Sequence, residues 1–415
     1  MPEYSPQQGS SLAGTDRLDR GPAALLFAGL FANAVGQAFV FAILPPLGRS
    51  VGLDEIRITS IISTSALVFT LTAPFWGRFS DRAGRKPVIL IGLLGYSLGS
   101  LSYAILFGLA GEGWMSGLML FSLALALRSL QAASMSATSP GCTAYAVDHT
   151  VARFRIKALA RLSSANSLGM IMGPVLAGLV AGFGLLAPLV VASVLSGLAA
   201  VLIALRLPAG VKPRPSQHPQ KRMGYLDERV RPFLISAIGA FTGFAMVQQT
   251  LAFRLQDTLL LSGADTARYT GFAMMASAAS TLVMQVAISQ RFNGPPIQLV
   301  RWGAGLLAGG TIVISLFASW EAVLSSMALI GAGLGLLMPA VAAGASLAVS
   351  PEEQGGVSGL VSACPAAGFV LGPISGGFLY QYHAPLAAWG AALMLSVMFL
   401  FTLRLGQQRG GASAY

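Results

Sequence analysis

Long apolar runs alternate with short polar breaks along almost the whole chain. The first run, from about Pro22 to Leu47, is long enough to cross a hydrocarbon core of ~30 Å at ~1.5 Å per residue. Comparison of the runs with the breaks predicts twelve membrane-spanning helices, starting near residues 22, 57, 87, 114, 157, 185, 231, 266, 296, 320, 354 and 384. We therefore expect an all-α polytopic membrane protein without a cleaved signal peptide.

The polar segments divide these spans into two sets of six. The stretch "RLPAGVKPRPSQHPQKRMGYLDERVR" at 206–231 is rich in proline and charge, which is typical of a linker. We expect a disordered cytoplasmic tail over 1–21, an N-terminal six-helix bundle over 22–207, a cytoplasmic linker over 208–230, a C-terminal six-helix bundle over 231–405 and a second cytoplasmic tail over 406–415.

Basic residues gather on one side of this topology. With both chain ends on that side, the 26 Lys and Arg residues lie there with five exceptions, which are Arg49, Arg57, Arg128, Arg254 and Arg268. Positive charge favours the cytoplasmic side of a membrane. We therefore expect both termini in the cytoplasm and a multi-pass protein of the bacterial inner membrane.

The two halves share a repeated motif. "GMIMGPVLAGLV" at 169–180 in the fifth span matches "GFVLGPISGGFL" at 368–379 in the eleventh. The pairs are Gly169 with Gly368, Gly173 with Gly372, Pro174 with Pro373 and Gly178 with Gly377. A duplicated six-helix unit predicts two pseudo-symmetric bundles and a secondary transporter whose site lies between them.

The segment "GRFSDRAGRKPVIL" at 77–90 places four basic residues and an aspartate between the second and third spans. It resembles the loop motif of the major facilitator superfamily (MFS), most closely its twelve-span drug/proton antiporter branch. The resemblance covers about 22–405, and the matching residues are Gly77, Asp81, Arg82, Gly84, Arg85 and Lys86. It implies a cytoplasmic conformational latch, in which Asp81 meets the start of the eleventh helix and stabilises the outward-facing state. The alternative is a solvated loop that only sets topology.

Two further motifs strengthen this resemblance. "RSLQAAS" resembles the family's arginine motif through Arg128 and Gln131, although Ala132 replaces a usual glycine. Arg128 lies ~21 Å into its span, where a charge costs at least ~2.5–3.5 kcal/mol. The resemblance implies proton transfer or substrate contact, and the alternative is a structural arginine bound to backbone carbonyls of the first span. "GMIMGPVLAG", with Gly169, Gly173, Pro174 and Gly178, resembles the signature of exporters, and close small-residue packing is its alternative.

Polar residues recur in the first spans of the two halves. Asn33 and Gln37 lie one turn apart in span one, and span seven carries Gln248, Gln249, Arg254 and Asp257. We expect them to line a central substrate or proton pathway, with interhelical hydrogen bonding as the alternative. "AYAVDHT" at 144–150 resembles the approach to an antiporter loop, where we expect Asp148 to cap a helix or to pair with Arg153.

None of the fifteen acidic residues lies near the middle of a predicted span, and span one has no charged residue of the kind that many drug antiporters carry there. Asp257, three residues after Arg254 and near the outer end of span seven, is our first candidate for a proton carrier. Two arginines facing a cavity without a central carboxylate favour anionic or zwitterionic cargo, such as a carboxylate siderophore. Amphipathic drugs are the other expected cargo.

Several other classes of protein are disfavoured. No G-x-x-x-x-G-K-[ST] loop precedes any lysine, and the three histidines show no H-E-x-x-H pattern. Cys142 and Cys364 are isolated, which predicts packing rather than a disulfide framework. We expect no enzymatic activity, no cofactor and no metal, and as partners a small-molecule substrate, protons and the lipid bilayer, without nucleic acid, in a monomer. A proton-coupled uptake symporter and a non-transporting receptor on the same fold remain alternatives.

Overall fold

The computed structural model describes residues 19–208, 227–289, 291–350 and 353–410, so most of the expected tails and linker lies outside the described residues. The regular structure of the described ranges is helical, with no strand among them. The helices are α1 (Arg20–Ser50), α2 (Glu55–Ala83), α3 (Arg85–Gly111), α4 (Gly117–Met135), α5 (Thr138–Asp148), α6 (Ala152–Val180), α7 (Ala187–Arg206), α8 (Arg231–Leu259), α9 (Gly263–Met284), α10 (Pro296–Leu316), α11 (Trp320–Leu347), α12 (Gln354–Tyr382) and α13 (Ala384–Gly410), with a 3-10 turn η1 (Ala181–Phe183) and a π-helical turn η2 (Gln285–Ser289).

Twelve segments of this described part are long and apolar enough to span a membrane, as the apolar runs predict. The last four segments begin at the predicted residues, and the others begin within about five residues of them. At the two ends of the chain the helices extend further than expected. α1 already begins at Arg20, and α13 continues to Gly410.

The fourth span is broken into α4 and α5, which the apolar pattern does not predict. Pro140 has no N–H to donate to the carbonyl of Ser136, four residues earlier, and so interrupts the helix there. Side chains of α2 bind the broken segment: the Trp76 indole N–H donates to the Ala133 carbonyl at 2.6 Å, and the hydroxyls of Thr72 and Ser136 lie 2.9 Å apart. These two hydrogen bonds thus attach the end of α4 and the break after it to α2.

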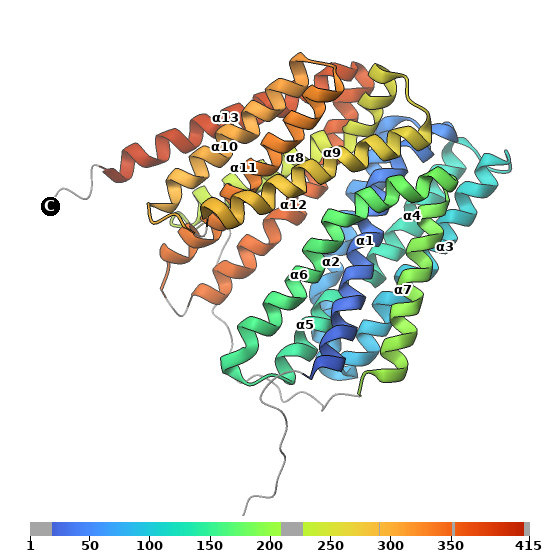
Figure 1. The fold of residues 1–415 in the computed structure, drawn as a ribbon, viewed down its shortest axis with the longest axis horizontal. Coiled ribbons are helices and arrows are strands. Elements are labelled where there is room, and N and C mark those ends of the chain that lie inside the picture. The colour runs from blue at the N-terminus through green and yellow to red at the C-terminus, as the bar shows by residue number, and fades with distance from the viewer. Residues whose placement is uncertain (1–18, 209–226, 290, 351–352, 411–415) are drawn as a thin grey trace, which may run out of the picture.

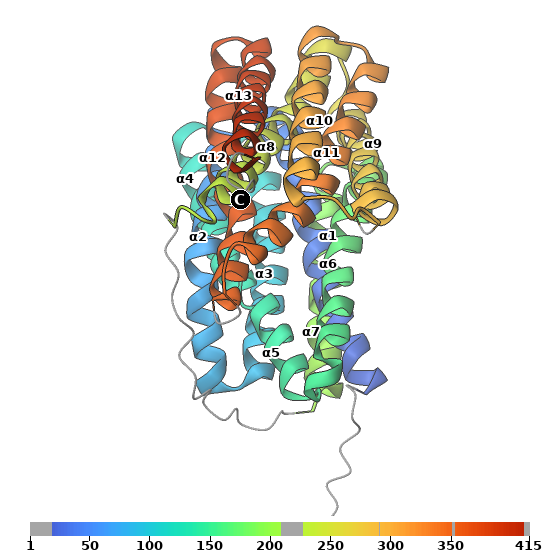
Figure 2. The same ribbon diagram turned by 90° about the vertical axis from the view of Figure 1, so that its left-hand side faces the viewer.

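The helices form two bundles, α1–α7 and α8–α13. In Figure 1 the bundles meet at the right and diverge toward the lower left, and Figure 2 shows the C-terminal bundle above the N-terminal one. The repeated glycines have equivalent neighbours in both: a Cβ on Gly173 of α6 would lie 3.2 Å from the Val35 carbonyl of α1, and a Cβ on Gly372 of α12 would lie 2.6 Å from the Thr242 carbonyl of α8. The structure therefore confirms the pseudo-symmetric fold.

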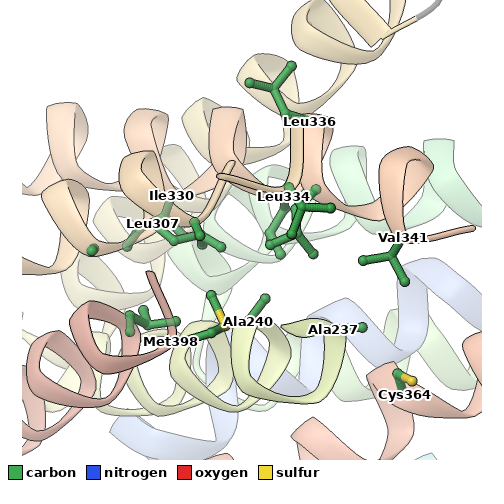
Figure 3. Close-up of a cluster of buried hydrophobic side chains, with 14 of the residues drawn as sticks. Ala237, Ala240, Leu307, Ile330, Leu334, Leu336, Val341, Cys364 and Met398 are labelled. Atoms are coloured by element: carbon green, nitrogen blue, oxygen red, sulfur yellow. The ribbon is translucent and has the colours of Figure 1, made fainter. Parts of the chain in front are cut away.

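Apolar clusters fill both bundles, and one cluster also joins them, because it includes Phe253, Ala267 and Tyr380 of the C-terminal bundle. Figure 3 shows part of the C-terminal core, where Leu307, Ile330 and Leu334 pack near Ala240 and Met398. The two cysteines belong to these cores as free thiols. Cys142 is buried in the N-terminal bundle and Cys364 in the C-terminal one.

We call the two ends of the helical bundles the terminal end and the far end, according to whether the chain termini lie there. The terminal end carries the start of α1, the α2–α3 turn, the start of α12 and the end of α13, and the far end carries the α1–α2, α8–α9 and α12–α13 turns. Between the bundles, α2 packs on α12 and α6 packs on α9.

Candidate functional site

Small residues bring the two bundles into close contact at the far end. A Cβ on Gly178 of α6 would lie 2.7 Å from the Arg268 Cα of α9, and one on Gly271 of α9 would lie 3.0 Å from the carbonyl carbon of Pro174. Gly377 of α12 lies against Thr59 of α2, which is fully buried. Backbone therefore meets backbone at Gly178 and Gly271, and Gly377 leaves room for the Thr59 side chain, so that larger side chains are excluded at all three glycines. The last glycine of each repeat thus contacts the opposite bundle.

Aromatic rings form the next layer of the bundle interface, nearer the middle of the helices. The rings of Phe41 in α1 and Phe369 in α12 stack with centroids 5.5 Å apart and planes 3° apart. Phe241 and Phe244 of α8 lie 6.4 and 6.3 Å from Phe369. Aromatic rings favour offset-stacked and edge contacts, so these rings also offer a surface to which other planar apolar groups can bind.

The terminal end is more open between the bundles. Phe75 and Phe79 of α2 are exposed there and line a shallow pocket with Arg78 and Arg82. The ribbons of α6 and α12 diverge in the same direction in Figure 1. The bundles are thus in close contact at the far end, and their ribbons diverge toward the terminal end (Figure 1).

Arg128 is buried inside the N-terminal bundle, with 2% of its surface exposed. Its Nη1 donates to the Gln131 amide oxygen at 2.5 Å, and the Gln131 amide N–H donates to the Ser100 hydroxyl at 2.8 Å. The Nε of Arg128 and the hydroxyls of Tyr96 and Tyr103 have no hydrogen-bond partner in the described structure. The structure therefore joins the expected pair Arg128 and Gln131, and this interior cation has no described carboxylate partner.

The amides of α1 and α8 are mostly enclosed by protein. Asn33, Gln248 and Gln249 are buried, whereas Gln37 is half-buried. The Gln248 amide nitrogen lies 3.9 Å from the Met274 sulfur of α9. Both polar atoms of Gln249 and the amide oxygens of Asn33 and Gln248 lack partners among the described residues. Such groups destabilise a buried interface until a ligand, water or a conformational change satisfies them.

The charged α2–α3 loop is tied into its own bundle. Arg85 donates to Asp81 at 2.6 Å and to Asp148 of α5 at 2.8 Å. Lys86 donates to the Ala204 carbonyl of α7 at 2.8 Å. The side chain of Arg153, the expected partner of Asp148, lies outside the described residues. Arg85 thus joins the loop to α5.

Asp81 is open to solvent in this arrangement. Its side chain is 62% exposed, and the partner that we identify for it is Arg85 rather than the start of α12. Arg82 is exposed, Gly77 has free space around it, and Gly84 ends α2 with a φ of +94°, a conformation that favours glycine. The expected latch contact between Asp81 and α12 is therefore not formed in this conformation.

A second ion network lies at the same end, outside the spans. Arg229, before α8, donates to Asp227 at 2.8 Å and to Glu353, before α12, at 3.1 Å. The bonds from Arg229 hold the pKa of the Asp227 carboxyl below its usual value. The stabilisation from Asp227 is therefore present at neutral pH and is lost as the pH falls through its lowered pKa. This network joins the starts of α8 and α12.

Asp257 has a different partner from the one that its spacing suggests. Arg254, one turn earlier, donates to the Phe317 carbonyl at 3.0 Å. The Asp257 carboxylate instead accepts from Arg49 of α1 at 2.7 and 3.0 Å. The structure therefore places Arg49 of the neighbouring bundle, and not Arg254, at the Asp257 carboxylate.

Two groups of residues were missed by the sequence reasoning. Arg49, Glu55 and Tyr380 surround Asp257 at the far end, and the four phenylalanines meet at the middle of the interface. For the first group a signal existed, because Arg49 is one of few basic residues predicted on the outer side, next to the acid Glu55. The phenylalanines could not be distinguished from ordinary apolar residues of a span.

Comparisons with known proteins match this fold. The family model described as "Major Facilitator Superfamily" matches residues 26–309. "Multidrug resistance protein 1" of Bacillus subtilis (strain 168) is 27% identical over 387 residues, which cover 91% of this chain and 95% of that protein. "Tetracycline resistance protein, class G" of Vibrio anguillarum is 25% identical and covers 92% of this chain and 95% of that protein. A crystal structure of a bacterial homologue of the human lysosomal transporter Spinster superposes with a TM-score of 0.77 at 15% identity, covering 93% of this chain and 96% of that one.

Proposed function

Since the chain belongs to the Major Facilitator Superfamily, we propose that it exports small amphipathic molecules by alternating access, in exchange for protons. It is a multi-pass bacterial membrane transporter and not an enzyme. The names of its relatives, which refer to multidrug and tetracycline resistance, support export of drugs.

The distribution of basic residues supports an orientation of the protein in the membrane. With the terminal end in the cytoplasm, the positive-inside rule is satisfied by the α2–α3 loop, the start of α6 and the segment before α8. The conformation described here is then closed to the outside and separated on the cytoplasmic side. Cargo enters from the cytoplasm, and rocking of the two bundles carries it outward.

One observation supports an amphipathic cargo most directly: an aromatic group lies at the bundle interface, and buried amides without partners among the described residues follow about one turn further along α8. The Phe41–Phe369 stack offers planar apolar surface. Gln248 and Gln249, four and five residues beyond Phe244 in α8, supply buried amide groups that await partners. A planar molecule with a few polar groups satisfies both features.

Accumulation of fluorescent amphipathic compounds in cells, with and without the gene, tests this proposal. We expect deletion to raise accumulation and Phe369→Leu to reproduce most of that rise. Phe378→Leu is the matched control, because Phe378 lies in the same helix, is 49% exposed and is expected to leave efflux unchanged. Reduced accumulation on deletion would indicate an uptake symporter. Absence of flux in proteoliposomes under an imposed proton gradient would indicate a receptor.

Anionic or zwitterionic cargo, such as a carboxylate siderophore, is the second candidate. Arg128 favours it, because this buried cation has no described carboxylate partner. Efflux of matched carboxylate and methyl-ester forms of one compound distinguishes the two cargo classes. Preferential retention of the carboxylate form upon deletion supports anionic cargo, and preferential retention of the ester excludes it.

Asp81→Asn tests the proposed latch. Asp81 is exposed and paired only within its own loop in this conformation, so we expect its loss to change thermal stability by less than about 1 kcal/mol. Transport should nevertheless fall by about fivefold or more, because the cytoplasmic contact with the start of α12 forms only in the opposite conformation. Efflux and melting temperature are measured together. Arg78→Gln is the control, because it removes a charge from the same helix at a position that is not one of the motif residues. Normal efflux by Asp81→Asn would exclude the latch.

A further inference from the structure

The far-end cluster consists of Arg49, Glu55, Asp257 and Tyr380, contributed by four helices. Arg49 at the end of α1 pairs with Glu55 at the start of α2 at 2.5 Å and with Asp257 near the end of α8 at 2.7 Å. The Tyr380 hydroxyl of α12 donates to Asp257 at 2.5 Å. One arginine therefore faces two carboxylates, of which Glu55 belongs to its own bundle and Asp257 to the other.

Rings reinforce the contact of Arg49 with the C-terminal bundle. Its guanidinium carbon lies 4.7 Å from the ring centroid of Phe253 and 5.8 Å from that of Tyr380. Arg49 Nη1 also approaches the Gln256 amide oxygen at 3.3 Å. Cation–π contacts and charge-assisted bonds both favour the approach of α1 to α8 and α12. The cluster therefore holds the far end closed.

The division of the cluster between the bundles determines which charges each bundle carries when the bundles separate. Arg49 and Glu55 leave together as a neutral pair. Asp257 and Tyr380 leave together with one net negative charge if Asp257 is ionised. A proton on Asp257 removes that charge and weakens its bond to Arg49, while Arg49 keeps Glu55. Neither bundle is then left with a bare charge at its surface.

We propose that the far-end cluster is a proton-binding site that opens the outer side of the transporter, with Asp257 as the group that takes the proton and Glu55 as the partner that retains Arg49. The Asp257 side chain is 43% exposed, so protons reach it from the far end. The inference deepens the proposed proton exchange and depends on it for its physiological role. The cargo is not part of it.

The other titratable groups that we consider at the far end have partners other than Asp257 or are exposed to solvent. From α1, α2 and α12, the charged or titratable groups placed at Asp257 are Arg49, with Glu55 behind it, and Tyr380. Arg254 on α8 turns to Phe317. Asp54 forms its own ion pair with Arg57 at 3.2 Å, and exposed His383 follows α12. His383 is a second titratable group at this end and is the main competing explanation for a pH response.

Pulsed electron–electron double resonance, which measures the distance between two spin labels, tests the proposal on purified protein in lipid nanodiscs without any transport assay. Nitroxide labels at Glu112→Cys, after α3, and Ala318→Cys, before α11, report the separation of the bundles at the far end, where both positions are exposed. Cys142 and Cys364 are replaced by alanine in this background. We expect acidification from pH 8 to pH 4 to increase the open-to-closed ratio, because protonation of Asp257 removes its charge-assisted bonds to Arg49.

The variants give effects of opposite sign. Asp257→Asn should be about tenfold more open at pH 8 and lose the pH response. Glu55→Gln should be more closed at pH 8, because Arg49 then depends on Asp257 alone. His383→Gln should keep the wild-type response. Opening by both Glu55→Gln and Asp257→Asn would reduce the cluster to an ordinary structural ion pair, and loss of the response only in His383→Gln would assign it to the histidine. Both results overturn the inference, and an accumulation assay checks export separately.

Discussion

Arg128→Met is expected to stabilise the folded protein and to abolish transport. The guanidinium is 2% exposed, forms one described hydrogen bond and leaves its Nε unpartnered. Burial of a cation under these conditions costs at least ~2.5–3.5 kcal/mol, and methionine fills similar space without charge. Allowing for loss of the bond to Gln131, we expect a net gain of about 1–2 kcal/mol, measured as a higher melting temperature in detergent. Efflux should fall to background.

Arg301→Met is the matched control for this substitution. Arg301 of α10 donates to the carbonyls of Thr402 and Leu403 in α13, at 3.1 and 3.0 Å. Its guanidinium is thus satisfied by backbone, as the structural interpretation of Arg128 requires. Arg301→Met should lower the melting temperature and leave efflux near normal. A destabilised Arg128→Met with normal efflux would show that Arg128 is a structural residue as well.

Gly178→Leu is expected to hold the far end apart and stop transport while each bundle stays folded. A Cβ at this position would lie 2.7 Å from the Arg268 Cα and 3.2 Å from the Ala267 carbonyl oxygen, and backbone atoms cannot rotate away. Overpacking costs about 1–3 kcal/mol, and here that cost falls only on the state with a closed far end. The ratio of open to closed molecules should rise by about tenfold or more, with efflux reduced accordingly.

Gly182→Leu serves as the control for Gly178→Leu, since it adds the same side chain four residues later into open space. It should have normal efflux and a normal far-end distance. Distances between the Glu112 and Ala318 labels and efflux are measured for both variants. Equal behaviour of the two variants would contradict the role that we assign to the bundle contact at Gly178.

The spans and their pairing into bundles followed from local features of the sequence. Apolar runs of sufficient length predict spans directly, because the hydrocarbon core sets their length. The matching glycines of the repeat predict equivalent packing, which the contacts of Gly173 and Gly372 show. The break between α4 and α5 also had a local cause, in Pro140, but an apolar run hides a proline unless each proline is examined.

The ion pairs of the site depend on contacts that no local pattern encodes. Asp257 and Arg254 are one turn apart, so helical spacing suggested that they interact. The actual partner, Arg49, is 208 residues away and reaches Asp257 only because the bundles meet at the far end. Asp81 is a second example, since the resemblance implies a contact with α12 in the outward-facing state, whereas here Asp81 pairs with Arg85 of its own loop.

If the two bundles rock against each other about a shared interface, distances between the bundles at the two ends must change in opposite directions. Labels at Glu112 and Ala318 report the far end, and labels at Arg206 and Arg291, exposed at the ends of α7 and η2, report the terminal end. On addition of a transported compound together with acidification, we expect a longer far-end distance and a shorter terminal-end distance in the same molecules. Distances that rise together, or that both stay constant while transport proceeds, would contradict it.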